Sequence, residues 1–189
     1  MRAPVAAPCL LAFFCLAWCA AAPAQVPRAS AVVEPHAYAS LEPVPRGRVF
    51  EIAVVARIRP GFHLNAHEVS QDYLIPTQLE AALPAGFRLR ETRYPPGVLR
   101  KFRFSPAKLS VYTGSVVLRM RLEALSAAPL GRRELPLALS YQACNEEACF
   151  PPVKVPVSAE IEIAPAGAAA RAAHASLFPA SPPKSVPAH

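Results

Sequence analysis

The sequence is poor in the residues that bind soft metals or cross-link a small scaffold. It has two methionines and one tryptophan among 189 residues, and three of its five cysteines lie in an apolar N-terminal segment. The rest of the chain holds Cys144 and Cys149, which allow one disulfide and exclude a disulfide-rich fold. Their CxxxxC spacing is not the close spacing of zinc sites, and Met120 alone offers little to copper. His63 and His67 are more often polar surface or core residues than ligands, so we expect no metal and no other cofactor.

The chain also lacks a run of basic residues. Its formal net charge of +7 comes from 20 Lys and Arg against 13 Asp and Glu, and the cations are spread along the sequence. Nucleic-acid binding needs a basic patch or stripe. We therefore expect no nucleic-acid partner, and we expect the protein to be a monomer.

The N-terminal segment has the features of an export signal. Arg2 precedes an apolar run over residues 5–22, and the run ends in the small-residue triplet Ala22–Ala24. We predict a cleavable signal peptide over residues 1–24 and a periplasmic mature protein. Two alternatives stay open: an uncleaved anchor, for which the run is short of about 20 residues, and a lipoprotein signal at Cys19.

Alternation of apolar and polar side chains is the clearest pattern in the chain. It predicts half-buried strands over residues 50–58, 116–123, 134–141 and 153–163, with weaker candidates at 62–66, 73–80 and 87–94. No segment after the signal shows a sustained helical repeat, and prolines interrupt most segments that could otherwise form a helix. About seven short strands predict an all-β fold, an immunoglobulin-like β-sandwich.

The strand pattern also sets the expected domain limits. We predict a single sandwich domain over residues 44–164, a loose leader over 25–43 that could add an edge strand, and a disordered Ala/Pro-rich tail over 165–189. Pro136 and Pro156 cannot donate to a ladder, so we expect them at a sheet edge or a bulge.

The two cysteines flank a short loop between the last two predicted strands. Cys144 and Cys149 would face each other across a hairpin mouth, where a disulfide forms easily. Facing them also pairs Tyr141 with Pro152, so one strand must bulge or the loop must absorb a residue. A loop this small stabilises the fold by only about 2 kcal/mol on the chain-entropy model, which makes the bond a poor staple. The spacing by itself nevertheless leaves structural and redox roles open.

The loop between the cysteines carries negative charge. Glu146 and Glu147 lie within it, and the nearest cation in the sequence is Lys154. Neighbouring carboxylates disfavour a thiolate. The reduced cysteines should therefore be slow nucleophiles that need a partner to position them.

Residues 139–152, LSYQACNEEACFPP, resemble the active-site hairpin of the N-terminal periplasmic domain of the thiol:disulfide interchange protein DsbD. Four further stretches match motifs of this family in the same order. They are PGFHLNA at 60–66, DYLIPT at 72–77, RYP at 93–95 and SVYTG at 110–114. The resemblance covers about residues 44–163.

The resemblance implies an immunoglobulin-like sandwich that receives electrons from a membrane-embedded carrier and passes them to periplasmic thioredoxin-fold oxidoreductases. The protein would be an electron shuttle and not a free-standing enzyme. Cys149 would form the mixed disulfide with partners and Cys144 would resolve it. In the family a cap-loop aromatic shields the pair, and the candidates here are Phe102 and Phe104. Both could instead be core residues of a strand. Tyr141 is expected to support the site as a packing residue whose hydroxyl finds a partner.

Two departures from the family pattern carry their own expectations. Arg100 and Lys101 stand where the family's cap loop has acidic residues, which predicts an ion pair with Glu146 or Glu147. After Ile163 the sequence shows neither a multi-span membrane region nor a thioredoxin-like domain with its own CxxC. We therefore expect the electron donor to be a separate integral-membrane thiol carrier.

Other functions remain open on the sequence. A non-redox exported binding or chaperone-like sandwich would keep the same disulfide as a structural clip, and an accessory role in metal or cytochrome assembly is a third option. A shuttle's disulfide should have a potential well above the roughly −300 mV of structural bonds.

Overall fold

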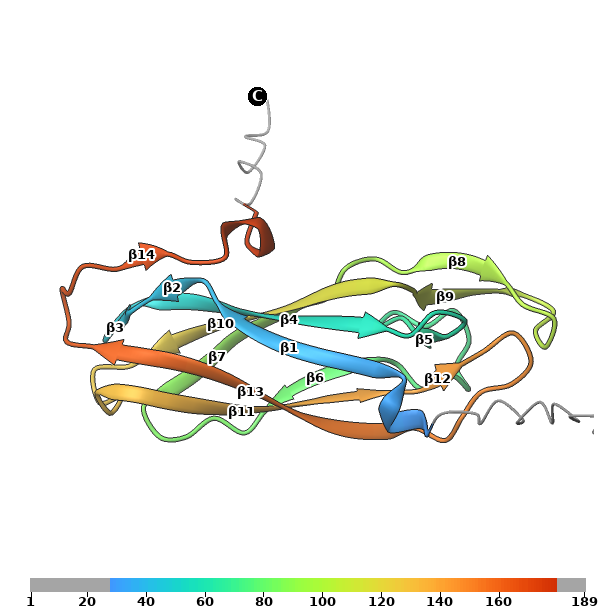
Figure 1. The fold of residues 1–189 in the computed structure, drawn as a ribbon, viewed down its shortest axis with the longest axis horizontal. Coiled ribbons are helices and arrows are strands. Elements are labelled where there is room, and N and C mark those ends of the chain that lie inside the picture. Colours follow the sequence, from blue (N-terminus) through green and yellow to red (C-terminus); the bar gives the residue numbers. More distant parts are fainter. Residues whose placement is uncertain (1–27, 180–189) are drawn as a thin grey trace, which may run out of the picture.

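The computed structural model describes residues 28–179, which form two facing β-sheets and a smaller sheet at one end (Figure 1). The first sheet has the order β1-β4-β10-β7. Its strands are β1 (Val33–Ala39), β4 (Val49–Ile58), β10 (Ser115–Ala124) and β7 (Phe87–Arg93). The second has the order β3-β13-β11-β6. Its strands are β3 (Val44–Pro45), β13 (Val153–Ala164), β11 (Gly131–Tyr141) and β6 (Gln78–Ala81).

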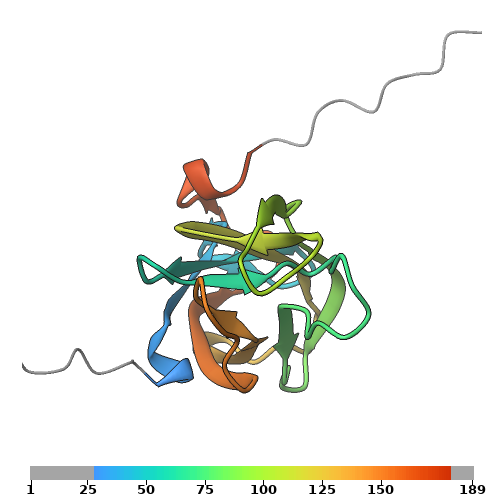
Figure 2. The same ribbon diagram turned by 90° about the vertical axis from the view of Figure 1, so that its right-hand side faces the viewer.

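The end sheet has the order β12-β5-β9-β8 and lies on the right in Figure 1. It consists of β12 (Ala143–Cys144), β5 (His63–Asn65), β9 (Lys108–Tyr112) and β8 (Val98–Lys101). Figure 2 looks onto this end, where loops from both halves of the chain come together. The remaining elements are β2 (Leu41–Glu42), β14 (Arg171–Ala172) and the short 3-10 helices η1 (Ala29–Ala31) and η2 (Ala175–Leu177). Within residues 28–179, no helix is long and apolar enough to span a membrane.

The alternation seen in the sequence accounts for the core. Every second residue of β4, from Phe50 to Ile58, is buried, and Leu118, Met120 and Leu122 of β10 are fully buried against them. Successive strand side chains point to opposite faces, so this spacing places one apolar face of each sheet inward. The predicted all-β immunoglobulin-like sandwich is confirmed.

The segment before residue 44 belongs to the sandwich. β1 pairs with β4 from Val33 opposite Ile58 to Ala39 opposite Ile52, as an edge strand of the first sheet. The edge-strand alternative is therefore the one observed, and a loose leader is wrong for the part of 25–43 that the structure describes. The predicted signal peptide, residues 1–24, lies outside the described residues.

The predicted disordered tail needs correction for residues 165–179. Arg171 of β14 pairs with Glu42 of β2, and the Ala173 amide donates to the Ser40 carbonyl. Arg119 donates from Nε to the Leu177 carbonyl at 2.6 Å. The segment is held by hydrogen bonds and not by apolar burial, so its composition does not reveal the pairing. Residues 180–189 lie outside the described part of the chain.

The two strand prolines differ in what lies beside them. Pro156 of β13 pairs with Ala138 of β11, and β3 joins the other side of β13 only at residues 163–164. Pro136 of β11 lies just before the residues that pair with β6, which begin at Leu137. The expected edge is confirmed for Pro156 and wrong for Pro136, because β11 is an inner strand whose register does not shift there and the Pro136 carbonyl accepts from the Ala82 amide.

Candidate functional site

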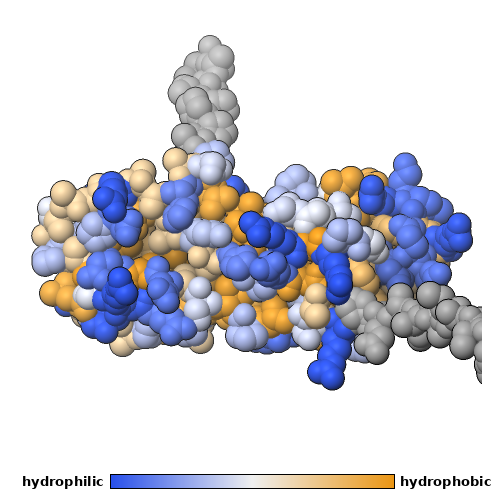
Figure 3. All heavy atoms as spheres, viewed as in Figure 1, coloured by the Kyte–Doolittle hydropathy of each residue, from blue (hydrophilic) through white to orange (hydrophobic). Residues whose placement is uncertain are grey.

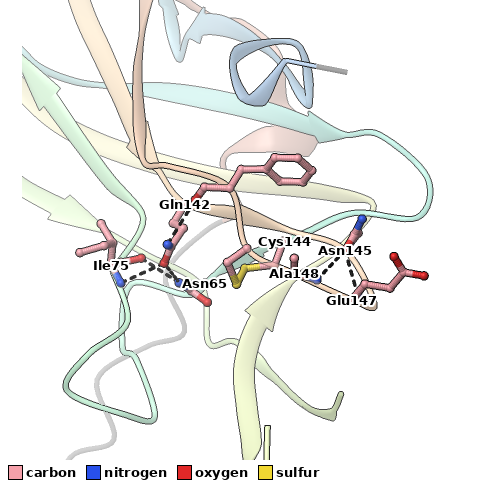
Figure 4. The surroundings of a disulfide bond; sticks show 9 residues. Asn65, Ile75, Gln142, Cys144, Asn145, Glu147 and Ala148 are labelled. Carbon is pink, nitrogen blue, oxygen red and sulfur yellow. Dashed lines mark hydrogen bonds between the residues drawn. A yellow bond between two sulfur atoms is a disulfide. The ribbon is translucent and has the colours of Figure 1, made fainter. Parts of the chain in front are cut away.

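Cys144 and Cys149 form a disulfide at the tip of the hairpin that follows β11 (Figure 4). Their Cα atoms are 3.9 Å apart, and the two residues pair as an isolated antiparallel bridge. The loop between them closes with a hydrogen bond from the Asn145 amide to the Ala148 carbonyl. The Asn145 side-chain oxygen accepts from the amides of Glu147 and Ala148 at 2.9 and 2.8 Å. The conformation of this tip is therefore fixed by hydrogen bonds in addition to the disulfide.

The bulge expected from the sequence is present. Tyr141 pairs with Val153, whereas Cys144 pairs with Cys149, so residues 142–143 on one arm oppose 150–152 on the other. An extra residue on one strand bends it and re-aims the side chains beyond it. This one-residue offset allows Tyr141 to face the core while the cysteines still meet.

The two cysteines differ strongly in exposure. Cys144 has no exposed surface, while Cys149 is exposed together with residues 146–148 of the loop. A thiolate arriving from solvent therefore reaches the disulfide on the side of Cys149.

Gln142 connects the two arms of the hairpin to the end sheet (Figure 4). Its side-chain oxygen accepts from Asn65 Nδ2 at 3.0 Å and from the Ile75 amide, and its Nε2 donates to the Phe150 carbonyl at 3.3 Å. The Phe150 amide in turn donates to the Ala143 carbonyl. These bonds hold the residues next to each cysteine in place. The sequence contained Gln142 within the hairpin motif but offered no sign of this role.

Tyr141 is a buried packing residue whose hydroxyl finds a partner, as expected. Its ring is fully buried and its hydroxyl donates to the Ala29 carbonyl at 2.9 Å, while burial raises the pKa of the phenol. This bond ties the end of β11, three residues before Cys144, to the start of the described chain.

Phe102 and Phe104 lie in the loop between β8 and β9, so neither is a strand residue. Phe102 is 3% exposed and packs with Leu74, Leu109 and Val111, whereas Phe104 is 37% exposed. Their rings stack on one another with centroids 5.5 Å apart. Phe102 is thus a buried anchor of the loop, and Phe104 is the aromatic that its tip presents to solvent.

The loop and the hairpin tip border a common hollow of about 610 Å³. It is lined by residues 101–106 and by Glu146. The expected ion pair is not formed: among the described residues, Glu146 and Glu147 have no cationic partner, and Lys101 Nζ donates instead to the carbonyls of Ser105 and Pro106. Figure 3 shows hydrophilic side chains gathered at this end of the molecule. The cap loop and the cysteine hairpin are neighbours without an ionic link.

His63, which the sequence suggested only as a possible metal ligand or a polar surface or core residue, lies at the site. It lies directly opposite Cys144 in the pairing of β5 with β12 and is 3% exposed. Its imidazole stacks on Phe102, with ring centroids 3.9 Å apart and planes 15° from parallel. Burial, and secondarily the charge of Arg100, lower the pKa of His63 to about 4. The imidazole is therefore neutral at neutral pH, and its Nε2 has no hydrogen-bond partner.

The lowered pKa of His63 predicts a loss of stability in mild acid. The unfolded imidazole takes up a proton near its ordinary pKa of 6.5, whereas the folded one does so near 4. The lowered pKa therefore has no effect on the free energy of unfolding above pH 6.5. As the pH falls from 6.5 to 4, it lowers that free energy by about 3 kcal/mol in all. Urea unfolding across this range should show that loss in the parent and not in His63→Phe. Parallel curves for the two proteins would contradict it.

Within residues 28–179, no group of three His, Cys, Asp or Glu side chains is placed to hold a metal ion. The redox-capable group that the structure shows at the site is the disulfide of Cys144 and Cys149.

A comparison with known families finds a match that includes the cysteine hairpin. The family described as thiol:disulfide interchange protein DsbD, N-terminal, matches residues 29–160. The chain belongs to this family. The family match begins at residue 29 and so includes β1, which agrees with the pairing of β1 in the sandwich of this DsbD N-terminal-like domain. The resemblance inferred from the hairpin and its four companion motifs is thereby confirmed.

Two solved structures are similar to the domain at low identity. The N-terminal periplasmic domain of ScsB from Proteus mirabilis is 12% identical, with a TM-score of 0.43 over 67% of this chain and 46% of that one. AggA, the major subunit of aggregative adherence fimbriae type I from Escherichia coli, is 7% identical, with a TM-score of 0.29 over 69% and 96%. The chain thus spans under half the length of the ScsB chain it matches. A comparison with curated proteins finds no match.

Proposed function

We propose that this DsbD N-terminal-like domain is a periplasmic thiol-disulfide exchange module. It relays electrons through Cys144 and Cys149 between a separate integral-membrane thiol carrier and thioredoxin-fold oxidoreductases. The observation that carries the proposal is the pairing of an exposed Cys149 with a fully buried Cys144 at the tip of a hairpin. Membership of the family supports the class of chemistry and of partners.

The exposure of the cysteines suggests the order of the reducing steps. A donor thiolate attacks Sγ of Cys149, the bond between the two cysteines breaks, and its electron pair passes to Sγ of Cys144. The second donor thiolate then attacks the mixed disulfide and releases Cys149 as a thiolate. The donor leaves as a disulfide, and the two cysteines have gained two electrons and take up two protons from water.

Delivery to an acceptor reverses these roles. The Cys149 thiolate attacks the acceptor's disulfide, and one acceptor sulfur leaves with the electron pair. Cys144 then attacks Cys149 in the mixed disulfide, which restores the bond between them and releases the acceptor as a dithiol. The buried sulfur needs to reach only its neighbour, which is what the paired backbone of residues 144 and 149 allows.

The surroundings of the disulfide support a working role over a stabilising one. The enclosed loop is worth only about 2 kcal/mol as a restraint on the unfolded chain. Gln142 and Asn145 already hold both arms and the tip by hydrogen bonds. The hairpin can therefore keep its shape when the disulfide opens.

A redox titration tests the proposal. We expect the disulfide to equilibrate with dithiothreitol or glutathione buffers at a potential well above about −300 mV. The reduced fraction is measured by alkylating free thiols and determining the mass of the protein by mass spectrometry. The Cys144→Ser/Cys149→Ser double variant supplies the alkylation blank. A disulfide that stays closed below that potential would show instead a non-redox binding module with a structural clip.

A further inference from the structure

The strongest unassigned feature is the imidazole of His63, which is buried beside the disulfide and has a ring nitrogen without a hydrogen-bond partner. His63 and Cys144 are directly opposite in an antiparallel pair. Side chains at such positions lie on the same face of the sheet with Cβ atoms about 4.5–5.5 Å apart. Nε2 is inaccessible to solvent and has no partner in the oxidised protein. Buried polar groups are nearly always paired, so an orphaned one beside a reactive bond requires an explanation.

We propose that Nε2 of His63 becomes the hydrogen-bond partner of the Cys144 sulfur when the disulfide opens. The inference rests on the proposed function, because it concerns the reduced form that exchange creates. A disulfide sulfur has no hydrogen to donate and accepts weakly. Once Cys149 is attacked and the electron pair passes to Cys144, its thiolate is a strong acceptor for an imidazole N–H, and the thiol that forms with a proton from water donates S–H to a bare ring nitrogen.

The groups around His63 keep it neutral and in place. Phe102 of the cap loop covers one face of its ring. Arg100 of β8 disfavours the imidazolium by its charge, while Lys101 and Arg103 add cations to the cap loop and Glu146 is the carboxylate of the hairpin tip beside it. A neutral imidazole offers the sulfur a hydrogen bond and does not act as the acid that protonates it. The stack on Phe102 also makes the cap loop a support for this contact.

The test replaces the ring nitrogens and keeps the ring. His63→Phe preserves the stack on Phe102, and His67→Phe is the matched control, because His67 stacks on Tyr94 with centroids 3.5 Å apart and bonds to the Thr77 carbonyl. The Cys144 thiol pKa is read from thiolate absorbance in the Cys149→Ala background, where no second thiol of the hairpin interferes. The reduction equilibrium is measured against dithiothreitol in the parent background.

We expect His63→Phe to raise the Cys144 thiol pKa by about one unit and to shift the reduction equilibrium about tenfold toward the disulfide, or about 30 mV. His67→Phe should change neither the acid dissociation constant of the Cys144 thiol nor the reduction equilibrium constant by more than about twofold, as expected for an uncoupled site. Equal thiol pKa values in folded parent and His63→Phe proteins would overturn the inference.

A measurement without substitution covers the case in which His63→Phe does not fold. The ring-nitrogen NMR signals of His63 should move on reduction of the parent protein, while those of His67 stay in place; unmoved His63 signals also overturn the inference. Failure of the proposed function looks different. In that case the thiol pKa still responds to His63, but the disulfide of the parent protein stays closed in the dithiothreitol or glutathione titration.

Discussion

Cys144→Ala should react through Cys149 with a thioredoxin-fold partner and hold it as a stable mixed disulfide, at least about ten times faster than Cys149→Ala reacts through Cys144. Cys149 is exposed, whereas Cys144 has no exposed surface, and thiol exchange depends on access to the attacking sulfur. The product persists in Cys144→Ala because the sulfur that would resolve it has been removed. The two variants each keep one cysteine of the hairpin and are matched in every other respect.

The reaction can be followed with a purified partner. A thioredoxin-fold protein whose buried active-site cysteine is alanine carries its remaining thiol as a mixed aryl disulfide. Attack by the variant releases the aryl thiolate, which is measured by absorbance, and the joined proteins are seen on a non-reducing gel. Similar rates for both variants, or faster reaction through Cys144, would reverse the assignment of the attacking and resolving cysteines.

The second large effect separates the two cap-loop aromatics by stability. Phe102→Ala should lower the free energy of unfolding by about 3–5 kcal/mol, because it removes a ring that is 3% exposed and packs under the loop. Phe104→Ala should cost less than about 1 kcal/mol, since its ring is 37% exposed and already meets water. Urea unfolding of the oxidised proteins measures both values.

The same pair of variants shows which aromatic shields the cysteines. With the fold intact, Phe104→Ala should speed reduction of the disulfide by a small thiol, because Phe104 is the exposed ring of the loop that shares a hollow with Glu146 of the hairpin. The parent protein is the control. An unchanged reduction rate in Phe104→Ala, together with an equal stability loss in both variants, would contradict the division into anchor and shield.

Several features of the fold were predictable because they depend on nearest neighbours along the chain. Alternation over β4, β10, β11 and β13 predicted their buried faces, because a strand's side chains alternate regardless of which strand lies beside it. The bulge before the cysteines followed from the same parity. The hairpin disulfide required only two cysteines on adjoining segments. The family resemblance came from the identity of consecutive residues.

The tertiary structure decided which segments pair across long stretches of chain. β12 has two residues, too few to carry a periodic signal, and β5 was only a weak candidate within residues 62–66. Their pairing alone places His63 opposite Cys144. The bond from Gln142 to Asn65 and the pairing of β14 with β2 likewise join residues far apart in sequence. The local sequence determined the strands and the position of the cysteine pair. The environment of those cysteines depends on non-local backbone pairing and burial, which no single segment encodes.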